Sequence, residues 1–189
     1  YREPKDFETF LYLSQLLQAE GIRIAIEAHR KAKPFCMGTL YWQLNDCWPV
    51  ASWSGIDYYG QWKALHYAVR QAFSPLLVVL ETDEEDWSAT IVSDEPEDKR
   101  LRLSTGLYRL SGERLWLEEK SLNMPANGKA LVGLEELKTA AADYDAADLW
   151  IRVQLSDSEG VAYDQTAYLV PARDLHLPVP KVKVSTEAN

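Results

Sequence analysis

The chain has 189 residues, 47% of them apolar and 26% charged, which is ordinary for a globular protein of one large or two small domains. The formal net charge of −9 and the pI of about 4.9 argue against binding to nucleic acid or to an anionic membrane, because both require a basic surface. No apolar run reaches the roughly 18 residues that cross a bilayer, and the charged first twenty residues are unlike a signal peptide. A neutral partner is therefore expected, and the compartment stays open.

A long amphipathic helix is predicted from Asp6 to about Lys33. Apolar residues recur there mostly at steps of three and four, which places them on one helix face. Asp6 suits the N-cap, because its side chain can accept a hydrogen bond from a free backbone N–H of the first turn. Pro34 ends the helix, since a proline disfavours the helical conformation of the residue before it.

The segment after this helix is short and almost continuously apolar from residue 36 to residue 44. Such a run is typical of a strand covered on both faces in a parallel sheet. A long loop from Asn45 to Gln61 follows, rich in turn formers, and a second helix is predicted from Trp62 to about Phe73. The order of helix, buried strand, long loop and helix indicates a fragment of an α/β architecture.

From Leu76 onward the apolar period changes from helical spacing to two, which indicates β-strands. Seven short strands separated by acidic or Gly-containing turns are typical of an immunoglobulin-like sandwich. The predicted strands are Leu76–Thr82, Trp87–Ser93, Leu101–Tyr108, Arg114–Leu122, Lys129–Leu134, Leu149–Ser156 and Val161–Leu169.

Aromatic residues are concentrated in one part of the chain. Trp42, Trp48, Trp53 and Trp62 fall within 21 residues, and four tyrosines accompany them. Beyond residue 76 only three tryptophans occur, all inside strand patterns where burial is the default. These three are Trp87, Trp116 and Trp150.

The tryptophan-rich segment resembles the closing segment of the (β/α)8 barrel in β-mannosidases of glycoside hydrolase family 2. The resemblance is carried by Gly38-Thr39-Leu40-Tyr41-Trp42-Gln43-Leu44-Asn45-Asp46-Cys47-Trp48-Pro49, by Ser52-Trp53 and Asp57-Tyr58, and by Gly60-Gln61-Trp62-Lys63-Ala64-Leu65-His66-Tyr67. Residues 13–22 are similar to the helix that the family places before that strand, and a sandwich follows the barrel there as well.

The resemblance implies an α+β multidomain fold. Residues 1–75 would be the C-terminal part of the glycosidase barrel, residues 76–172 an immunoglobulin-like sandwich, and residues 173–189 a linker toward a further C-terminal domain. Because the chain starts at Tyr1 without an initiator Met and ends after a proline-containing tail, we expect both ends to be cuts within a longer protein.

The implied sugar site lies at the end of the predicted strand, because barrel active sites lie at the carboxyl ends of the strands. A pyranose is recognised by an indole laid on its C–H patch and by polar groups aimed at its hydroxyls. The resemblance makes Trp42 the platform beneath the sugar. Neighbouring or rim positions would be taken by Asn45, Asp46, Trp48 and Trp53.

Each of these residues also has a purely structural interpretation. Trp42 could pack in the core, and Asn45 and Asp46 could be hydrogen-bonded at the start of a loop. Trp48 and Trp53 could close the mouth of the barrel. For residues 62, 63 and 66, on the second helix, packing under the loop is the favoured role.

A retaining glycosidase needs two carboxyl groups about 5 to 5.5 Å apart, and the sequence offers no such pair. The family places both upstream of Tyr1, and Glu3, Glu8 and Glu27 match neither motif. The chain alone is therefore expected to be inactive. No metal or cofactor is expected, because the spacing of Cys36 and Cys47 is no zinc pattern and the acidic turns lack the spacing of a calcium loop.

Three interpretations of function are compatible with the sequence. The first is a fragment of a retaining exo-β-mannosidase that removes terminal β-D-mannose, with a β-mannoside as partner of the intact protein. The second is a non-catalytic β-sandwich module that binds carbohydrate or protein, and the third is a fragment of a sibling β-galactosidase or β-glucuronidase. Because an incomplete barrel leaves apolar surface uncovered, a homo-oligomer through residues 1–75 is also expected.

Overall fold

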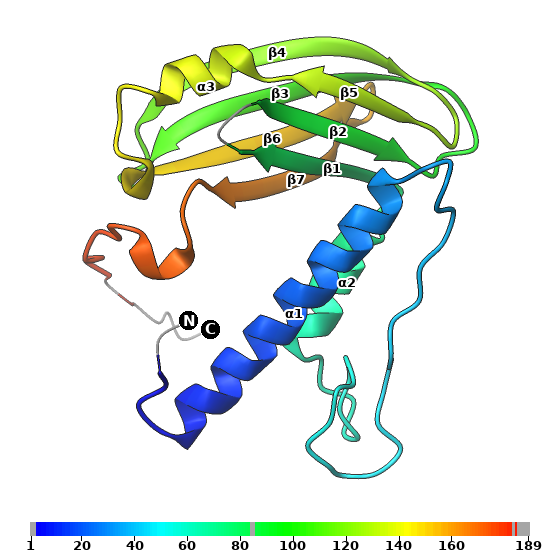
Figure 1. Ribbon diagram of the computed structural model, residues 1–189, viewed down its shortest axis with the longest axis vertical. Helices are drawn as coiled ribbons and strands as arrows, with labels where there is room; N and C mark the ends of the chain where they lie inside the picture. Colours follow the sequence, from blue (N-terminus) through cyan, green and yellow to red (C-terminus); the bar gives the residue numbers. More distant parts are fainter. Residues whose placement is uncertain (1–2, 84–85, 183, 185–189) are drawn as a thin grey trace, which may run out of the picture.

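The computed structural model describes residues 3–83, 86–182 and 184 as an α+β chain that is mostly a β-sandwich, with two packed helices beneath it (Figure 1). The first helix, α1, spans Phe7–Lys31, close to the predicted range. Asp6 is its N-cap, with the side chain accepting a hydrogen bond of 2.7 Å from the backbone N–H of Thr9. The second helix, α2, spans Ala64–Ala72.

The two helices share a small apolar core. Ile26 of α1 is 1% exposed and packs with three buried residues of α2. These are Leu65, Val69 and Ala72. The opposite side of α1 carries large apolar side chains that are half exposed or more. They include Phe7, Phe10, Leu17 and Ile24.

The strand predicted at residues 36–44 does not form. The segment is extended but pairs with no strand among the described residues, and an isolated bridge first appears at Asn45, opposite Ile56. Phe35 and Leu40 are 96% and 98% exposed, so the segment is also not covered on both faces. A strand requires at least one hydrogen-bonded neighbour, and the described part of the chain supplies none there.

All seven predicted strands are present with small differences at their ends. They are β1 Leu76–Thr82, β2 Trp87–Ser93, β3 Lys99–Arg109, β4 Arg114–Met124, β5 Lys129–Gly133, β6 Leu149–Asp157 and β7 Gly160–Tyr168. One sheet has the order β1-β2-β5 and the other β4-β3-β6-β7, and every neighbouring pair is antiparallel. Alternate residues of both sheets point inward and form the main core, for example Leu149, Ile151, Val153 and Leu155 of β6.

Three short helical segments were not predicted: α3 Glu135–Ala141, η1 Ala146–Asp148 and η2 Ala172–Asp174. Each is seven residues or fewer, too short to show a helical period in the sequence. Helix α3 nevertheless closes one end of the sandwich, because its Leu137 and Ala141 belong to the main core.

A buried cationic pair joins the end of α1 to the sandwich. Arg30 donates to the backbone oxygens of Ala72 at 2.6 Å and Ser74 at 2.8 Å, and to the Asp94 carboxylate at 2.8 Å. Lys33 is also buried; it donates to the backbone oxygen of Ser93 at 2.8 Å and forms an ion pair with Asp94. These bonds fix the helices against the turn that follows β2.

The chain ends are only partly described. Residues 1, 2, 183 and 185–189 of the expected ends, and residues 84 and 85 in the turn between β1 and β2, lie outside the described residues. Within the part that is described, no helix is both long enough and apolar enough to traverse a bilayer.

Candidate functional site

The tryptophan-rich segment extends away from the sandwich, beside the helices (Figure 1). Its aromatic side chains are largely exposed: Trp42 is 73% exposed, Trp48 66% and Trp53 60%. Trp42 is therefore not part of a closed core. An indole exposed to this degree can lie against a ligand or against another polypeptide.

Short contacts hold the two ends of this segment together. The backbone N–H of Gly55 donates to Gln43 O at 2.9 Å, and that of Ile56 donates to Leu44 O at 2.8 Å. The Trp53 indole N–H reaches the side-chain oxygen of Gln43 at 3.4 Å. The peptide bond between Trp42 and Gln43 is cis. The hydrogen bonds of Gly55, Ile56 and Trp53 bring the surroundings of Trp42 and Trp53 together, although the two tryptophans are eleven positions apart.

Helix α1 also supports the segment. Gln18 donates a hydrogen bond of 2.7 Å from its side-chain nitrogen to the backbone oxygen of Trp53. Nearer the end of the helix, His29 Nδ1 lies 2.8 Å from the hydroxyl of Thr39. Helix α1 therefore contacts both parts of the aromatic segment.

Asp46 lies at the centre of a buried polar cluster rather than at the surface. Its carboxylate accepts from Ser52 Oγ at 2.5 Å and from Ser54 Oγ at 2.7 Å, and Lys63 Nζ lies 3.3 Å away. The hydrogen bond from Ser52 and then that from Ser54 hold the pKa of the Asp46 carboxyl below its usual value. In the structure this carboxylate is occupied in holding the loop from residue 46 to residue 63.

Of the other positions considered in the sequence, one is exposed and one packs against neighbouring rings. Asn45 is exposed, and its side-chain nitrogen donates to the backbone oxygen of Asp46 at 3.1 Å. Trp62 packs edge-on against His66 at a ring separation of 4.4 Å and against Tyr67 at 5.2 Å. The substrate-binding roles of residues 42, 45, 46, 48 and 53 stay predictions.

The acidic groups of this segment are committed to its own loops. Between Gly38 and His66 the sequence holds two carboxylates, Asp46 and Asp57. The second accepts hydrogen bonds from the backbone N–H groups of Tyr59 and Gln61. The segment can therefore offer aromatic surface and hydrogen-bonding groups to a ligand, but not the paired carboxylates that glycoside hydrolysis requires.

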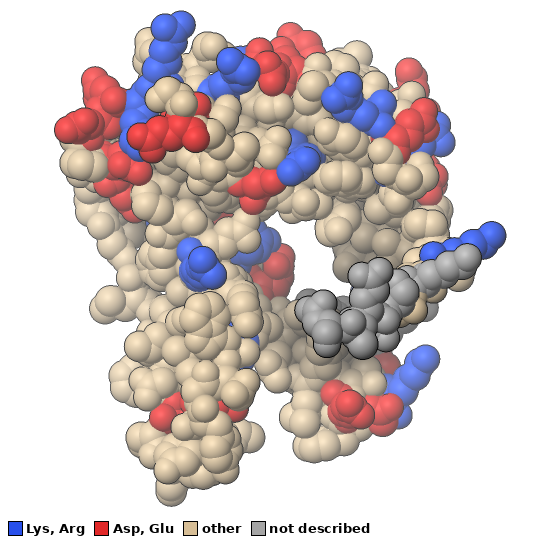
Figure 2. Space-filling view, turned by 180° about the vertical axis from the view of Figure 1, so that it is seen from behind, with Lys and Arg blue, Asp and Glu red and all other residues tan. Residues whose placement is uncertain are grey.

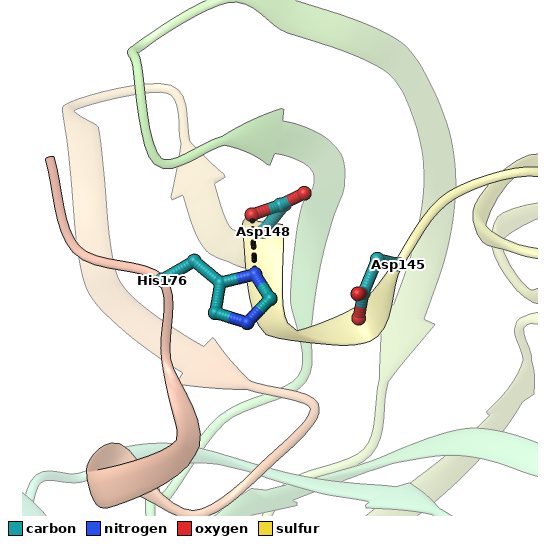
Figure 3. A group of neighbouring side chains, drawn as sticks. All are labelled: Asp145, Asp148 and His176. Carbon is teal, nitrogen blue, oxygen red and sulfur yellow. Dashed lines mark hydrogen bonds and ion pairs between the residues drawn. The ribbon is translucent and has the colours of Figure 1, made fainter.

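A group of side chains with metal-ligand chemistry lies elsewhere, at the end of the sandwich. The ligand atoms of Asp145, Asp148 and His176 all lie within 4.8 Å of one another (Figure 3). One oxygen of Asp145 already accepts from the backbone N–H of Ala147, and His176 Nδ1 lies 3.0 Å from Asp148 Oδ1. The backbone N–H of His176 also donates to Ala147 O at 3.0 Å. These contacts tether the segment after β7 to η1.

The fold and the aromatic segment agree with the class of protein that the sequence resembles. A sandwich of this type next to helices and a tryptophan-rich segment is what the sequence resemblance attributes to glycoside hydrolases of family 2. The family model described as "Mannosidase Ig/CBM-like domain" matches residues 85–174. Beyond the sandwich, the exo-chitosanase CsxA of Amycolatopsis orientalis shares the fold, with a TM-score of 0.65 over 88% of this chain at 22% identity.

Several β-mannosidases are also similar to this chain. That of Capra hircus is 38% identical over 120 residues, which make up 60% of this chain and 14% of the relative. β-Mannosidase B of Aspergillus oryzae (strain ATCC 42149 / RIB 40) is 39% identical over 72% of this chain and 17% of the relative. The crystal structure of the β-D-mannosidase from Dictyoglomus thermophilum aligns with a TM-score of 0.79 and 30% identity, over 94% of this chain and 22% of that chain.

These relations confirm the predicted resemblance: the chain is similar to part of the β-mannosidases of glycoside hydrolase family 2. It spans less than a quarter of the length of each of these relatives.

Proposed function

We propose that the chain is part of a longer retaining exo-β-mannosidase, in which the segment from Gly38 to Trp62 forms one wall of the pocket for a terminal β-D-mannose. The observation that carries this proposal is the exposure of Trp42, 73%, in a segment whose neighbouring backbone is hydrogen-bonded and supported by α1. An exposed indole on an ordered loop is unusual unless it meets a ligand or a partner surface.

Trp42 is the platform beneath the sugar under this proposal. Trp53 is positioned next to it, because its indole N–H contacts the residue that follows Trp42. Asp46 acts indirectly, since its bonds to Ser52 and Ser54 shape the loop that carries Trp53. Asn45 and Trp48 are exposed and remain available for the rim of the pocket.

The catalytic carboxylates belong to polypeptide outside these 189 residues under the same proposal. Two facts support this assignment: the carboxylates of the aromatic segment are used within its own loops, and the chain spans only 14% to 22% of three β-mannosidase relatives. A barrel assembled from the missing part would also give residues 36–44 the neighbouring strands that they lack. The chain alone is then inactive.

We also propose that the isolated chain forms a homo-oligomer through residues 1–75. The support is the exposed apolar side of α1, where Phe7 is 73% exposed and Leu17 58%. Exposed apolar side chains gathered on one side of a helix tend to be covered by association with another polypeptide. In the longer protein the same side would contact the rest of the barrel.

Hydrolysis of a nitrophenyl β-mannoside tests the proposal. The purified 189-residue protein should show no rate above that of buffer. In the longer protein, Trp42→Ala should lower kcat/KM by about 100-fold, equivalent to ~2.7 kcal/mol of transition-state stabilisation. Tyr144→Ala, which removes a partly exposed ring of the sandwich, is the matched control and should leave kcat/KM unchanged. Hydrolysis by the 189-residue protein, or equal rates for the two variants, would overturn the proposal.

A further inference from the structure

A second candidate site lies in a cleft of about 960 Å³ between the helix pair and the sandwich. The hollow between these two parts is visible from behind the molecule in Figure 2. One wall is formed by α1 and α2 and the other by the outer side of β6 and β7 with the end of β1. A volume of this order is at the upper end of the range for small-molecule sites. The cleft contains none of the tryptophans from the segment after Gly38.

An aromatic row crosses the outer face of the sheet and enters this cleft. In the strand register, Tyr108 of β3 stands opposite Trp150 of β6, which stands opposite Tyr168 of β7. Directly opposite residues of paired strands lie on the same face. The neighbours Leu149 and Ile151 are fully buried, so the row points outward. Trp150 and Tyr168 both line the cleft.

The central indole of this row is fixed before any ligand arrives. The ring of Tyr108 stacks on that of Trp150 at a centroid distance of 4.5 Å and an interplanar angle of 19°. The indole N–H of Trp150 donates to the backbone oxygen of Arg109 at 3.0 Å. Gly106 makes room for the Tyr108 ring, because a Cβ at this position would lie 2.6 Å from a ring carbon. A fixed ring loses little conformational entropy when it binds a ligand.

Polar groups on the same face stand beside the aromatic row. Arg152 donates to both oxygens of Asp164, at 3.1 and 2.6 Å, and Gln154 donates to one of them at 3.0 Å. Arg152 and Asp164 line the cleft. This arrangement presents hydrogen-bonding groups in fixed positions along the sheet, next to Trp150 and Tyr168.

The helix wall on the other side of the cleft also carries an arginine paired with carboxylates. Arg23 of α1 pairs with Glu20 at 2.8 Å and with Glu27 at 2.6 Å. Each cationic group of the two walls is thus already paired with carboxylates, so the cleft carries no uncompensated positive charge that would select an anion. Its lining instead suits a neutral ligand with many hydroxyl groups and apolar C–H patches.

We propose that this cleft is a carbohydrate-binding site, separate from the Trp42 segment, for a neutral oligosaccharide. The sugar rings lie against Trp150 and Tyr168, and their hydroxyls exchange hydrogen bonds with the Arg152–Asp164 pair and with the charged groups of α1. The site does not depend on the proposed catalytic function, because no residue of the segment from Gly38 to Trp62 contributes to it.

Titration of the 189-residue protein with β-1,4-mannohexaose, cellohexaose and maltohexaose tests this site. The seven tryptophans give seven indole N–H signals in a ¹H–¹⁵N NMR spectrum, and the Trp150 signal is assigned by its loss in Trp150→Phe. At least one of the three sugars should shift the Trp150 signal in a saturable way. Tyr168→Ala should weaken that binding by about tenfold, whereas Tyr144→Ala, a matched variant outside the cleft, should not change it.

A second variant shows whether a loss of sugar binding could come from altered folding. Asp164→Asn keeps the size of the side chain on the exposed edge of the sheet and should weaken binding several-fold while the spectrum stays that of a folded protein. Trp42→Ala should leave binding in the cleft unchanged, which separates this site from the proposed mannose pocket. If no sugar shifts the Trp150 signal at millimolar concentration, or if Tyr168→Ala and Tyr144→Ala bind equally, the proposal is wrong.

Discussion

The sandwich and the helical region differ in how fully each buries its own apolar residues. Among the described residues, the main core of the sandwich and α3 joins nineteen buried side chains, whereas the core between α1 and α2 joins four. Conversely, the region from residue 7 to residue 73 carries most of the large exposed apolar side chains, including Phe35, Leu40 and Trp42.

The difference shows which part of the chain is structurally self-sufficient. The two sheets of the sandwich bury their apolar residues against each other. The helices and the aromatic segment instead leave many large apolar side chains exposed. The polar bonds of Arg30, Lys33 and Asp46 hold this second region in place without burying its apolar side chains.

The largest effect is expected from a cavity in the sandwich core. Ile151→Ala should lower the free energy of unfolding by about 2 to 5 kcal/mol, because Ile151 is fully buried and its removal leaves a void. Urea unfolding followed by tryptophan fluorescence and circular dichroism measures this. Val161→Ala, at a position that is 62% exposed, should cost less than about 0.5 kcal/mol.

The same unfolding measurement on a variant of the helix core tests whether the helices and the sandwich unfold separately. Ile26→Ala should lower the helical signal at urea concentrations where the sandwich stays folded. A single transition, shifted equally by Ile26→Ala and Ile151→Ala, would contradict the separation of the two regions.

A smaller effect is expected at the junction between them. Arg30→Ala should cost about 2 to 4 kcal/mol in the stability of the docked helices, since it leaves the buried oxygens of Ala72 and Ser74 without their donor. Hydrogen exchange of α1 and α2 amides should accelerate, while amides of β3 and β6 keep their protection. Arg100→Ala, at an exposed position of β3, is the control and should change neither. Equal loss of protection in helices and sheet would contradict a local junction.

Association through the helices should respond to a charge on their exposed side. Leu17→Lys should raise the dissociation constant of the proposed homo-oligomer by at least about tenfold, or ~1.4 kcal/mol, because a buried lysine would lose its hydration. Light scattering over a concentration series measures this. Leu131→Lys, on a sandwich residue that is 72% exposed, should leave the dissociation constant unchanged. A monomer with folded helices at all concentrations would contradict the proposed homo-oligomer.

The smallest effect is a pH dependence confined to the loop around Asp46. Hydrogen bonds to its carboxylate lower the pKa of Asp46, so the ionised form stabilises the loop. This contribution is complete above the pKa of an unfolded aspartate, about 3.9, and is lost as the pH falls through the lower pKa of the folded state. Amide shifts of Ser52 and Ser54 should follow this titration below about pH 4. In Asp46→Asn they should be displaced already at pH 7 and insensitive to pH, and an unchanged titration in that variant would assign it to another group.

The parts of the fold that were predictable are those with a local pattern. The seven strands of the sandwich follow from alternation and turn residues, and α1 follows from helical spacing with Asp6 at its start. The prediction of a buried strand at residues 36–44 is wrong, because a continuous apolar run becomes a buried strand only where neighbouring strands cover it. Among the described residues no strand covers this segment, and Leu40 is 98% exposed.

The contacts of the sites were less accessible to sequence reasoning. Arg30 and Lys33 meet Asp94 across more than 60 residues, and no local pattern reports such a contact. The sequence makes Asp46 a candidate rim group, but no local pattern predicts its contact with Lys63. Trp150 did carry a signal: it shares its strand face with Arg152 and Gln154, and polar neighbours at steps of two indicate an outward face.

The contact of α1 with the turn after β2 has a consequence for biosynthesis. The amino group of Lys33 reaches Ser93 and Asp94, and lies 3.4 Å from the Asn127 side chain. A ribosome makes the helix first, yet nearly a hundred further residues must emerge before all the acceptors of Lys33 exist. During that interval α1 can pack only against α2, so the helix pair meets chaperones and neighbouring nascent chains before it is fixed to the sandwich.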